Sequence, residues 1–249
     1  MKKILLGTIA PIAFAMALCG VASAGDVGGI SGTLSGSYAT GTNVFYDANG
    51  AVTIPFNGNS WVDGSGLEAL GGYTSGSGGS GGNAWYFGGA LYTGGAAGRV
   101  AGNFVYHDFN GTSLNSYGVG GEWFATPSVT LAIRGGGANE SSTGGGYFGT
   151  QGTWYACPNF AVSAGVDYWS AGANITSETV RAEWAPSDTV PFALYAGYQN
   201  LFANGKRGGE LFLGVKLFTN GSGATTLVDR ERTGTNGYIS ESPVYFTQY

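Results

Sequence analysis

The distribution of apolar residues limits what this chain can fold into more than any other feature. After residue 24, no segment contains about 18 consecutive apolar residues, so a helix that spans a membrane is excluded. Apolar residues instead recur at every second position in runs of about ten residues, separated by clusters of Gly, Ser, Asn, Thr and Pro. This pattern is typical of a transmembrane β-barrel, whose strands place alternate side chains in lipid and in the lumen.

The alternation is clearest at residues 129–134, 160–169 and 210–217. In the second run, one face carries Phe160, Val162, Ala164, Val166 and Tyr168. The residues that alternate with them are small or polar, with the exception of Trp169. One face of this strand is therefore suited to lipid and the other to a polar lumen.

We predict an all-β fold, a transmembrane antiparallel β-barrel of twelve strands. The strands are expected near residues 28–39, 43–54, 61–73, 83–93, 97–108, 114–125, 128–138, 145–156, 159–170, 174–185, 191–200 and 207–219. The first three rest on Gly-rich alternation, so ten strands is an alternative. A soluble β-sandwich or adhesin would alternate in the same way. However, only 10% of residues are charged, against about 25% in soluble domains.

A second pattern supports the strand count. Glu122 to Pro127, Thr153 to Pro158 and Glu183 to Pro186 each place Trp shortly before Pro, about 30 residues apart. Trp favours the membrane interface, and Pro ends strand pairing. We expect these three strand ends to share one rim with tight turns, which would be the periplasmic rim. The polar, Gly-rich segments at 74–82, 109–113, 139–144, 171–173 and 201–206 are expected at the opposite rim.

The first 24 residues have the organisation of a secretory signal peptide. Lys2 and Lys3 precede an apolar stretch, and Ala22-Ser23-Ala24 forms a small-residue cleavage site. The expected organisation is thus a signal peptide at 1–24, a barrel at 25–219 and a tail at 220–249. Cys19 would be the cysteine of an alternative lipoprotein reading, but Leu18 before it is too large for that processing.

Removal of the signal peptide leaves an acidic chain with a single cysteine. The mature chain has 8 basic residues against 15 acidic ones, a net charge of −7, which argues against nucleic acid as a partner. Only Cys157 remains, so no intramolecular disulfide can form. Backbone pairing and burial must therefore stabilise the fold.

The charged residues of the strands are predicted to face the lumen. Asn110-Gly111 suits a two-residue hairpin turn, which places Arg99 directly opposite Glu122. The same parity turns further charged residues inward, namely Arg134, Asp167, Arg181, Glu183, Glu210 and Lys216. Because a charge on the lipid face costs about 2–4 kcal/mol at the bilayer midplane, any barrel requires this placement. The set can be a network of ion pairs, or it can tune passage of solutes; Arg99, Glu122, Arg134, Arg181 and Glu183 would lie nearest the periplasmic half.

Little in the sequence indicates catalysis or a cofactor. His107 is the single histidine, and its parity points it into the lumen near the outer end of its strand, where we expect a solvated rim residue with no facing serine. One histidine and one cysteine cannot form a transition-metal site, and the Gly-x-Gly strings precede no helix that could bind nucleotide. We expect no enzyme and no cofactor.

The last 31 residues continue beyond the final predicted strand. They contain Asp229-Arg230-Glu231-Arg232 and an aromatic end at residues 244–249. This tail could extend into the periplasm, fold into the lumen as a plug, or add a terminal strand. Its charged residues favour the first placement.

Two segments resemble a known family. Residues 117–127, with a Gly-rich strand ending in Trp and Pro, and residues 214–218 followed by 227–232 resemble the porin-like outer-membrane proteins of proteobacteria. The resemblance spans about residues 85–235 and implies a porin-type barrel, with no catalytic residues. The resemblance implies no particular solute, and it leaves a homo-oligomer, such as a trimer, as an open option. We predict passive diffusion of small hydrophilic solutes through a narrow charged lumen, in a barrel surrounded by outer-membrane lipids. A closed structural or adhesive barrel is the alternative, and an outer-membrane lipid hydrolase is a third.

Overall fold

The computed structural model describes the barrel and two parts of the tail. The described residues are 31–40, 44–56, 65–77, 82–109, 111–140, 143–171, 174–188, 190–203, 205–219, 226–233 and 237–240. The predicted signal peptide, the cleavage site and Cys19 lie outside this part of the chain. Their assignment stays a prediction.

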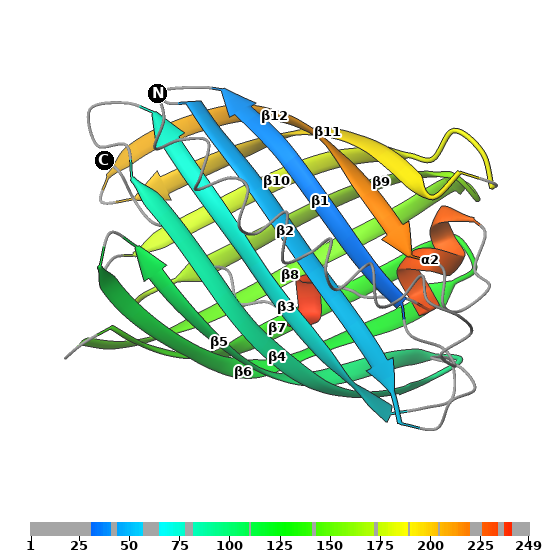
Figure 1. Cartoon of the computed structure of the whole chain (residues 1–249), viewed down its shortest axis with the longest axis horizontal. Helices are drawn as coiled ribbons and strands as arrows, with labels where there is room; N and C mark the ends of the chain where they lie inside the picture. Colours follow the sequence, from blue (N-terminus) through cyan, green and yellow to red (C-terminus); the bar gives the residue numbers. More distant parts are fainter. Residues whose placement is uncertain are drawn as a thin grey trace.

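Twelve strands and two short helices make up the described fold (Figure 1). The strands are β1 (Ser31–Thr40), β2 (Val44–Pro55), β3 (Ser65–Ser77), β4 (Asn83–Gly95), β5 (Gly98–Phe109), β6 (Thr112–Thr126), β7 (Val129–Glu140), β8 (Thr143–Cys157), β9 (Phe160–Trp169), β10 (Ile175–Trp184), β11 (Phe192–Ala203) and β12 (Lys206–Thr219). The helices are α2 (Leu227–Thr233) and α3 (Gly237–Ser240). The twelve predicted strands are confirmed, including the three Gly-rich ones, and the ten-strand alternative is wrong.

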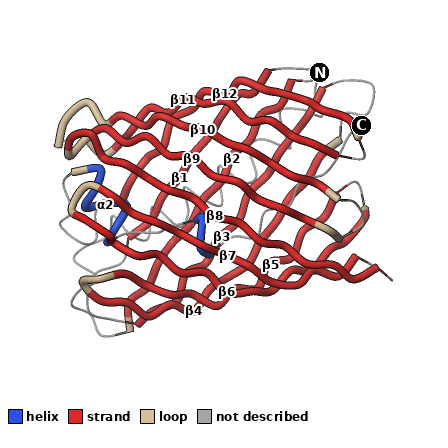
Figure 2. Tube along the Cα trace, turned by 180° about the vertical axis from the view of Figure 1, so that it is seen from behind, coloured by secondary structure: helices blue, strands red, loops and turns tan. Residues whose placement is uncertain are grey.

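The strands form one closed antiparallel barrel. Each strand pairs with its neighbours in sequence, and β1 pairs with β12 to close the sheet, from Gly32 opposite Thr219 to Thr40 opposite Leu211. Figure 2 shows the strands running obliquely around the barrel axis. Closure satisfies the backbone hydrogen bonds of both edges, which a sheet in lipid requires.

The hairpin at Gly111 fixes the register on which the lumen prediction depends. Gly111 has a φ of +86°, a conformation that glycine adopts without steric cost, and Phe109 pairs with Thr112. Counting back from this turn, Arg99 lies opposite Glu122. The predicted pairing is confirmed.

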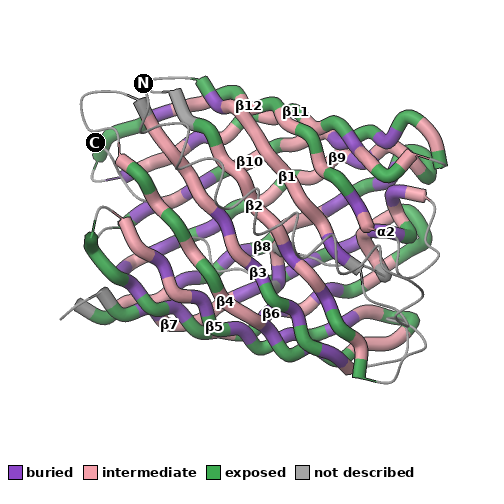
Figure 3. The backbone as a smooth tube through the Cα atoms, in the orientation of Figure 1, coloured by how far each residue is buried: buried purple, intermediate pink, exposed green. Residues whose placement is uncertain are grey.

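The outer surface is apolar, and exposed and buried residues alternate along strands such as β5 (Figure 3). Large apolar side chains are exposed all around the barrel, such as Val119 at 68% and Leu213 at 61%. Exposed apolar area of this extent is a membrane-facing surface. No helix in the described part of the chain is long and apolar enough to cross a membrane.

The three Trp-Pro segments lie at one rim, which we name the terminal rim because β1 begins there and β12 ends there. Trp123, Trp154 and Trp184 all point outward and are about half exposed. The register shifts just beyond two of them, after Trp123 and after Tyr155. Two of the connections are tight as predicted, whereas residues 185–191 form a longer one, since this segment also holds the tail.

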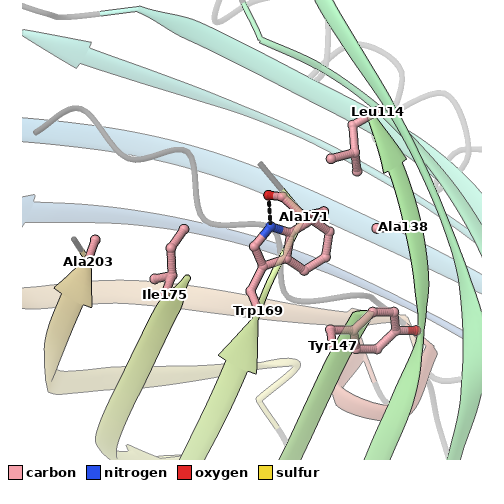
Figure 4. Packing of buried hydrophobic residues seen from close by; sticks show 7 residues of the cluster. All are labelled: Leu114, Ala138, Tyr147, Trp169, Ala171, Ile175 and Ala203. Carbon is pink, nitrogen blue, oxygen red and sulfur yellow. Dashed lines mark hydrogen bonds between the residues drawn. The ribbon is translucent and has the colours of Figure 1, made fainter. Parts of the chain in front are cut away.

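The opposite rim closes around an apolar cluster that faces inward (Figure 4). Trp169, 2% exposed, packs at the centre of this opposite-rim cluster, and its indole N–H donates to the carbonyl of Ala171 at 2.8 Å. The cluster consists of Leu114, Ala138, Tyr147, Trp169, Ala171, Ile175 and Ala203. The strand ends of β6 to β11 therefore supply a small hydrophobic core inside one mouth of the barrel.

Candidate functional site: the lumen and the tail within it

The structure places all eight charged strand residues that were predicted to face the lumen on the inward face of the wall. One is Glu210, and the other seven are the residues we predict to line the pore, Arg99, Glu122, Arg134, Asp167, Arg181, Glu183 and Lys216. Most of these side chains are buried, although they face a lumen. The reason is that the two tail helices lie inside the barrel and cover them.

The pair of Arg99 and Glu122 joins β5 to β6 near the terminal rim. Arg99 Nε lies 2.5 Å from Glu122 Oε2. The same guanidinium donates through Nη2 to the main-chain oxygen of Glu231 in α2, at 2.7 Å. Arg99 therefore holds a wall carboxylate and the tail at once.

Arg134 on β7 likewise contacts both a wall carboxylate and the tail. Its Nη2 lies 2.8 Å from Asp167 Oδ1 on β9, so the ion pair crosses β8. Its Nη1 donates to the main-chain oxygen of Tyr238 in α3 at 3.0 Å, and its guanidinium carbon stands 4.0 Å from the centre of the Tyr238 ring. A cation over an aromatic ring at this distance adds to the hydrogen bond.

A third group of charges lies on β10, β12 and α2. Arg181 and Glu183 form an ion pair on β10. Lys216 Nζ lies 3.6 Å from Glu183 Oε1 and 2.5 Å from Glu231 Oε1. Glu231 thereby brings a tail carboxylate into the network of the wall.

The environment of Glu231 favours its charged form. Burial alone would raise the pKa of the Glu231 carboxyl, but the attractions of Lys216 and Arg181 and the hydrogen bond from Lys216 outweigh burial and hold this pKa below its usual range. Glu231 is therefore ionised at neutral pH, as the contact with Lys216 requires.

Helix α2 is fixed to the terminal rim. Thr226 caps it, because the Thr226 hydroxyl oxygen accepts from the backbone N–H of Asp229 at 3.2 Å. The backbone N–H of Leu227 donates to Asn159 Oδ1 at 3.0 Å, and Leu227 is fully buried. Arg230 Nη1 donates to the carbonyl of Val190 at 2.8 Å, so the longer connection at 185–191 receives the helix.

Arg232 fixes the other side of α2. Its Nη2 donates to the carbonyl oxygens of Thr126 at 2.7 Å and Val129 at 3.2 Å, at the turn between β6 and β7. Its Nε lies 3.3 Å from the hydroxyl oxygen of Thr130. The arginines of α2 thus bind main-chain acceptors at the ends of strands.

Helix α3 lies deeper in the lumen, against β5, β6 and β7. Ile239, 1% exposed, packs on a patch that we name the α3 socket, which consists of Ala90, Tyr92, Ala101, Gly120 and Ala132. A Cβ atom at Gly120 would lie 2.6 Å from the main-chain oxygen of Ile239. Glycine at 120 is therefore what allows α3 to approach the wall this closely.

The described part of the tail takes the second of the three predicted placements. The expectation that its charges would favour the periplasm is wrong for residues 226–233 and 237–240. Those charges do not need water, because lumen groups of opposite sign and main-chain oxygens at the rim bind them. The α3 socket was not predicted from the sequence. The signal that could have indicated it is Gly120, which faces inward beside small residues.

A polar group on β1, β2 and β4 lines the half of the lumen nearer the opposite rim, which we name the outer half after the orientation predicted from the sequence. Asp47 accepts hydrogen bonds from Ser37 and, at 2.6 Å, from Asn49 Nδ2. The hydroxyl of Tyr86 donates to Asn49 Oδ1 at 3.1 Å. Glu210 faces inward on β12. The outer half is therefore acidic where it is charged.

The expectations for His107 were wrong in two respects. The side chain is 4% exposed, so it is buried and not a solvated rim residue. Its Nε2 lies 3.3 Å from the hydroxyl oxygen of Ser116, the facing serine that parity alone did not supply. Both side chains point into the lumen, and the Ser116 hydroxyl also lies 3.2 Å from the carbonyl of Val105. Within the described residues, no group of three or more His, Cys, Asp or Glu side chains could hold a metal ion.

Comparisons with known proteins agree with this architecture. No family model matches the sequence, and no curated protein matches it. Among solved structures, the chain is similar to the KdgM porin in complex with disordered oligogalacturonate, with 9% identity, 74% of this chain and 98% of that chain covered, and a TM-score of 0.58. It is also similar to the NanC porin, with 13% identity, coverage of 75% and 98%, and a TM-score of 0.55.

A further similar structure is an outer-membrane channel from Pseudomonas putida F1, with 12% identity, coverage of 78% and 97%, and a TM-score of 0.54. At these identities the likeness is one of fold. With the apolar belt and the closed barrel, it shows that this protein has the fold of the transmembrane β-barrels of the bacterial outer membrane.

Proposed function

We propose that this protein is a porin-like channel through which small hydrophilic solutes diffuse passively across the outer membrane, without a cofactor or catalytic turnover. One observation carries the proposal: a closed barrel with an apolar exterior turns most of its strand charges inward. Polar groups that line a closed barrel are the means by which porin-type channels select solutes. The similar structures are channels, which supports the same reading.

The charges of the lumen favour neutral or cationic solutes over anions. In the described strands away from the rim turns, six acids face inward, Asp47, Glu68, Glu122, Asp167, Glu183 and Glu210, against four bases, Arg99, Arg134, Arg181 and Lys216. Most of the bases are paired with acids, so the excess is small and acts mainly in the outer half. A polyanion such as the oligogalacturonate in the KdgM complex is therefore not the solute that this charge distribution favours.

A closed structural or adhesive barrel is the second candidate, because helices α2 and α3 occupy part of the lumen. An outer-membrane lipid hydrolase is less well supported. The pair of His107 and Ser116 has the side-chain types of a hydrolase, but both groups face the lumen, where a membrane lipid has no access. We expect the purified protein to break down lipid only at the background rate, and His107→Ala to leave that rate unchanged.

Conductance of the refolded chain, residues 25–249, in a planar lipid bilayer tests the proposal. We expect discrete steps and, in a salt gradient, a reversal potential that shows mild cation preference. Glu210→Gln should reduce this preference, whereas Glu178→Gln, on the outward face of β10, should not change it. Absence of steps from protein shown to be folded and inserted would favour the closed barrel.

A further inference from the structure

We propose that the tail is a reversible plug: α2 tethers it to the terminal rim, and α3 narrows the lumen when docked in its socket and opens it when it leaves. This inference rests on the proposed channel function. It concerns the contacts of residues 226–233 and 237–240 with the wall.

The wall is shaped to receive α3. Ala90, Ala101, Gly120 and Ala132 present small side chains side by side on four neighbouring strands, and Ile239 packs on them. The three atoms that a Cβ at Gly120 would meet first all belong to Ile239, at 2.6–2.9 Å. A larger residue at position 120 would thus conflict with the tail and with no other part of the wall at that range.

The wall donates hydrogen bonds to main-chain atoms of α3, and it also contacts the Tyr238 side chain, through Arg134 at the ring and Asp167 Oδ1 at the hydroxyl. Arg134 Nη1 donates to the carbonyl of Tyr238 and Asn103 Nδ2 to the carbonyl of Ile239, at 3.0 and 3.2 Å. Carbonyls in the last turn of a helix have no partner within the helix, so these donors supply what α3 needs when buried. Water can supply the same bonds when α3 leaves.

The ion pairs of the wall do not depend on the docking of α3. Arg134 is paired with Asp167, and Arg99 with Glu122, independently of the tail. When α3 leaves, these guanidinium groups keep their carboxylate partners and no charge loses its counter-charge. Undocking therefore avoids the large penalty that an uncompensated charge would impose.

The two helices are held differently, which makes α2 the tether. Helix α2 has Leu227 fully buried, and Arg230 and Arg232 bound to carbonyls of two rim connections. Helix α3 has four residues, one buried apolar side chain and no ion pair among its described side chains. Helix α3 lies close to the wall, but among the described residues fewer hydrogen bonds hold it than hold α2, and no ion pair does, so it is the part expected to move.

Two variants of the full chain displace α3 by different routes. Gly120→Val introduces a side chain into the space of Ile239. Ile239→Asp places a charge in the apolar socket and leaves the wall unchanged, so it covers the case in which Gly120→Val does not fold. The matched control is Gly121→Val, since a Cβ at Gly121 meets Val100 Cγ1 at an ordinary 3.5 Å on the other face of β6.

The position of α3 is measured independently of conductance by chymotrypsin cleavage after Tyr238, followed by mass spectrometry. We expect both displacing variants to be cleaved at least tenfold faster than the parent and Gly121→Val. In planar bilayers, the same two variants should show a higher open probability or a larger step than the parent and the control.

Each remaining result overturns a defined part of the proposal. If the cleavage rate at Tyr238 is the same in all four proteins, α3 does not dock as described. If cleavage accelerates while all four proteins conduct equally, α3 docks but does not gate, and the channel function stands. If folded, inserted proteins are all silent although cleavage accelerates, the channel function itself fails, and the gate with it.

Discussion

The two ends of the lumen are filled by different means. At the opposite rim, the filling comes from the wall itself, in the cluster around Trp169 and Ile175. At the terminal rim, it comes from a separate segment, α2 and α3, which ion pairs and hydrogen bonds hold against the wall. The first filling is apolar and continuous with the strands. The second combines ion pairs and hydrogen bonds with the buried side chains of Leu227 and Ile239, and it is connected to the strands only through the chain after β12.

This difference indicates which filling can move. Side chains of the opposite-rim cluster cannot leave without opening the hairpins that carry them, so their packing contributes to barrel stability. The tail can leave while all twelve strands stay paired. Substitutions at the two ends should therefore change different quantities, the free energy of unfolding at one end and the docking equilibrium of the tail at the other.

The largest effect is expected at the opposite rim. Trp169→Ala removes a buried indole and its hydrogen bond to Ala171, and should lower the free energy of unfolding by about 3–5 kcal/mol, as large-to-small changes in cores do. Urea titration of the barrel refolded in lipid vesicles measures this value. Chymotrypsin cleavage after Tyr238 in the folded state should not change.

Trp169→Phe is the matched variant for that experiment. It keeps most of the packing and loses the hydrogen bond, so a loss of about 1 kcal/mol is expected. If Trp169→Ala instead exposed Tyr238 to the protease without destabilising the barrel, the two ends would not be independent in the way their structures indicate.

A somewhat smaller loss is expected at the ion pair nearest the terminal rim. Glu122→Ala removes the carboxylate that Arg99 contacts while the guanidinium stays buried, which should cost about 3 kcal/mol of barrel stability. Replacing both residues by Met and Leu should recover much of this loss, because no buried charge then remains. The double replacement also removes the bond from Arg99 to Glu231, so it should loosen α2 while the barrel stays stable. Equal destabilisation by the single and double variants would contradict the assignment of the loss to an unpaired charge.

The barrel followed from the sequence because its determinants are local and periodic. Alternation of two fixes which side chains face lipid, and the Asn110-Gly111 turn fixes the register that brings Arg99 to Glu122. Gly-rich strands such as β3 were harder to assign, since glycine carries no apolar signal, but their pairing is fixed by neighbours on both sides.

The interior did not follow, because it depends on contacts between residues far apart in sequence. Glu231 meets Lys216, Ile239 meets Gly120, and Tyr238 meets Arg134, and no periodicity relates them. Considered alone, a charged tail is predicted to lie in water. The lumen that receives it contains the complementary charges, and only the closed barrel brings them together. His107 was misplaced for the same reason, because its partner Ser116 is diagonal to it across the hairpin.

A moderate effect, confined to the tail, is expected at Glu231. Glu231→Gln weakens a charge-assisted hydrogen bond to Lys216 and should favour release of α2 by about 1.5 kcal/mol at neutral pH. Because the pKa of Glu231 is held below its ordinary value of 4.5, the stabilisation by its charge is fully present above that value and is lost as the pH falls through the lowered pKa. Hydrogen exchange of residues 226–233, corrected for intrinsic rates, measures the release.

The pH dependence separates this carboxylate from its neighbours. The parent should show increasing exchange of α2 below about pH 4.5, and Glu231→Gln should show little of that change. Lys216→Met is a second route to the same loss at neutral pH, with Glu183 also affected. A parent and a Gln variant with identical pH profiles would show that Glu231 is not the group responsible for the acid sensitivity.

The smallest effect is expected at a chain of hydrogen bonds that links the two ends. Tyr147 packs with Trp169 in the opposite-rim cluster, and its hydroxyl donates to Asn103 Oδ1 at 3.3 Å, while Asn103 Nδ2 donates to the carbonyl of Ile239. Tyr147→Phe keeps the ring in the cluster and removes only the hydroxyl that orients the Asn103 amide. Barrel stability should change by less than about 1 kcal/mol, and chymotrypsin cleavage after Tyr238 should rise by about two- to fivefold, as the loss of part of one neutral hydrogen bond implies.

Asn103→Ala should give a larger rise, and combining it with Tyr147→Phe should add nothing further, since the hydroxyl acts on α3 only through that amide. Additive effects in the double variant would mean that Tyr147 influences the tail by another route, and that the apolar and polar ends of the lumen are coupled more widely than by this single chain of hydrogen bonds.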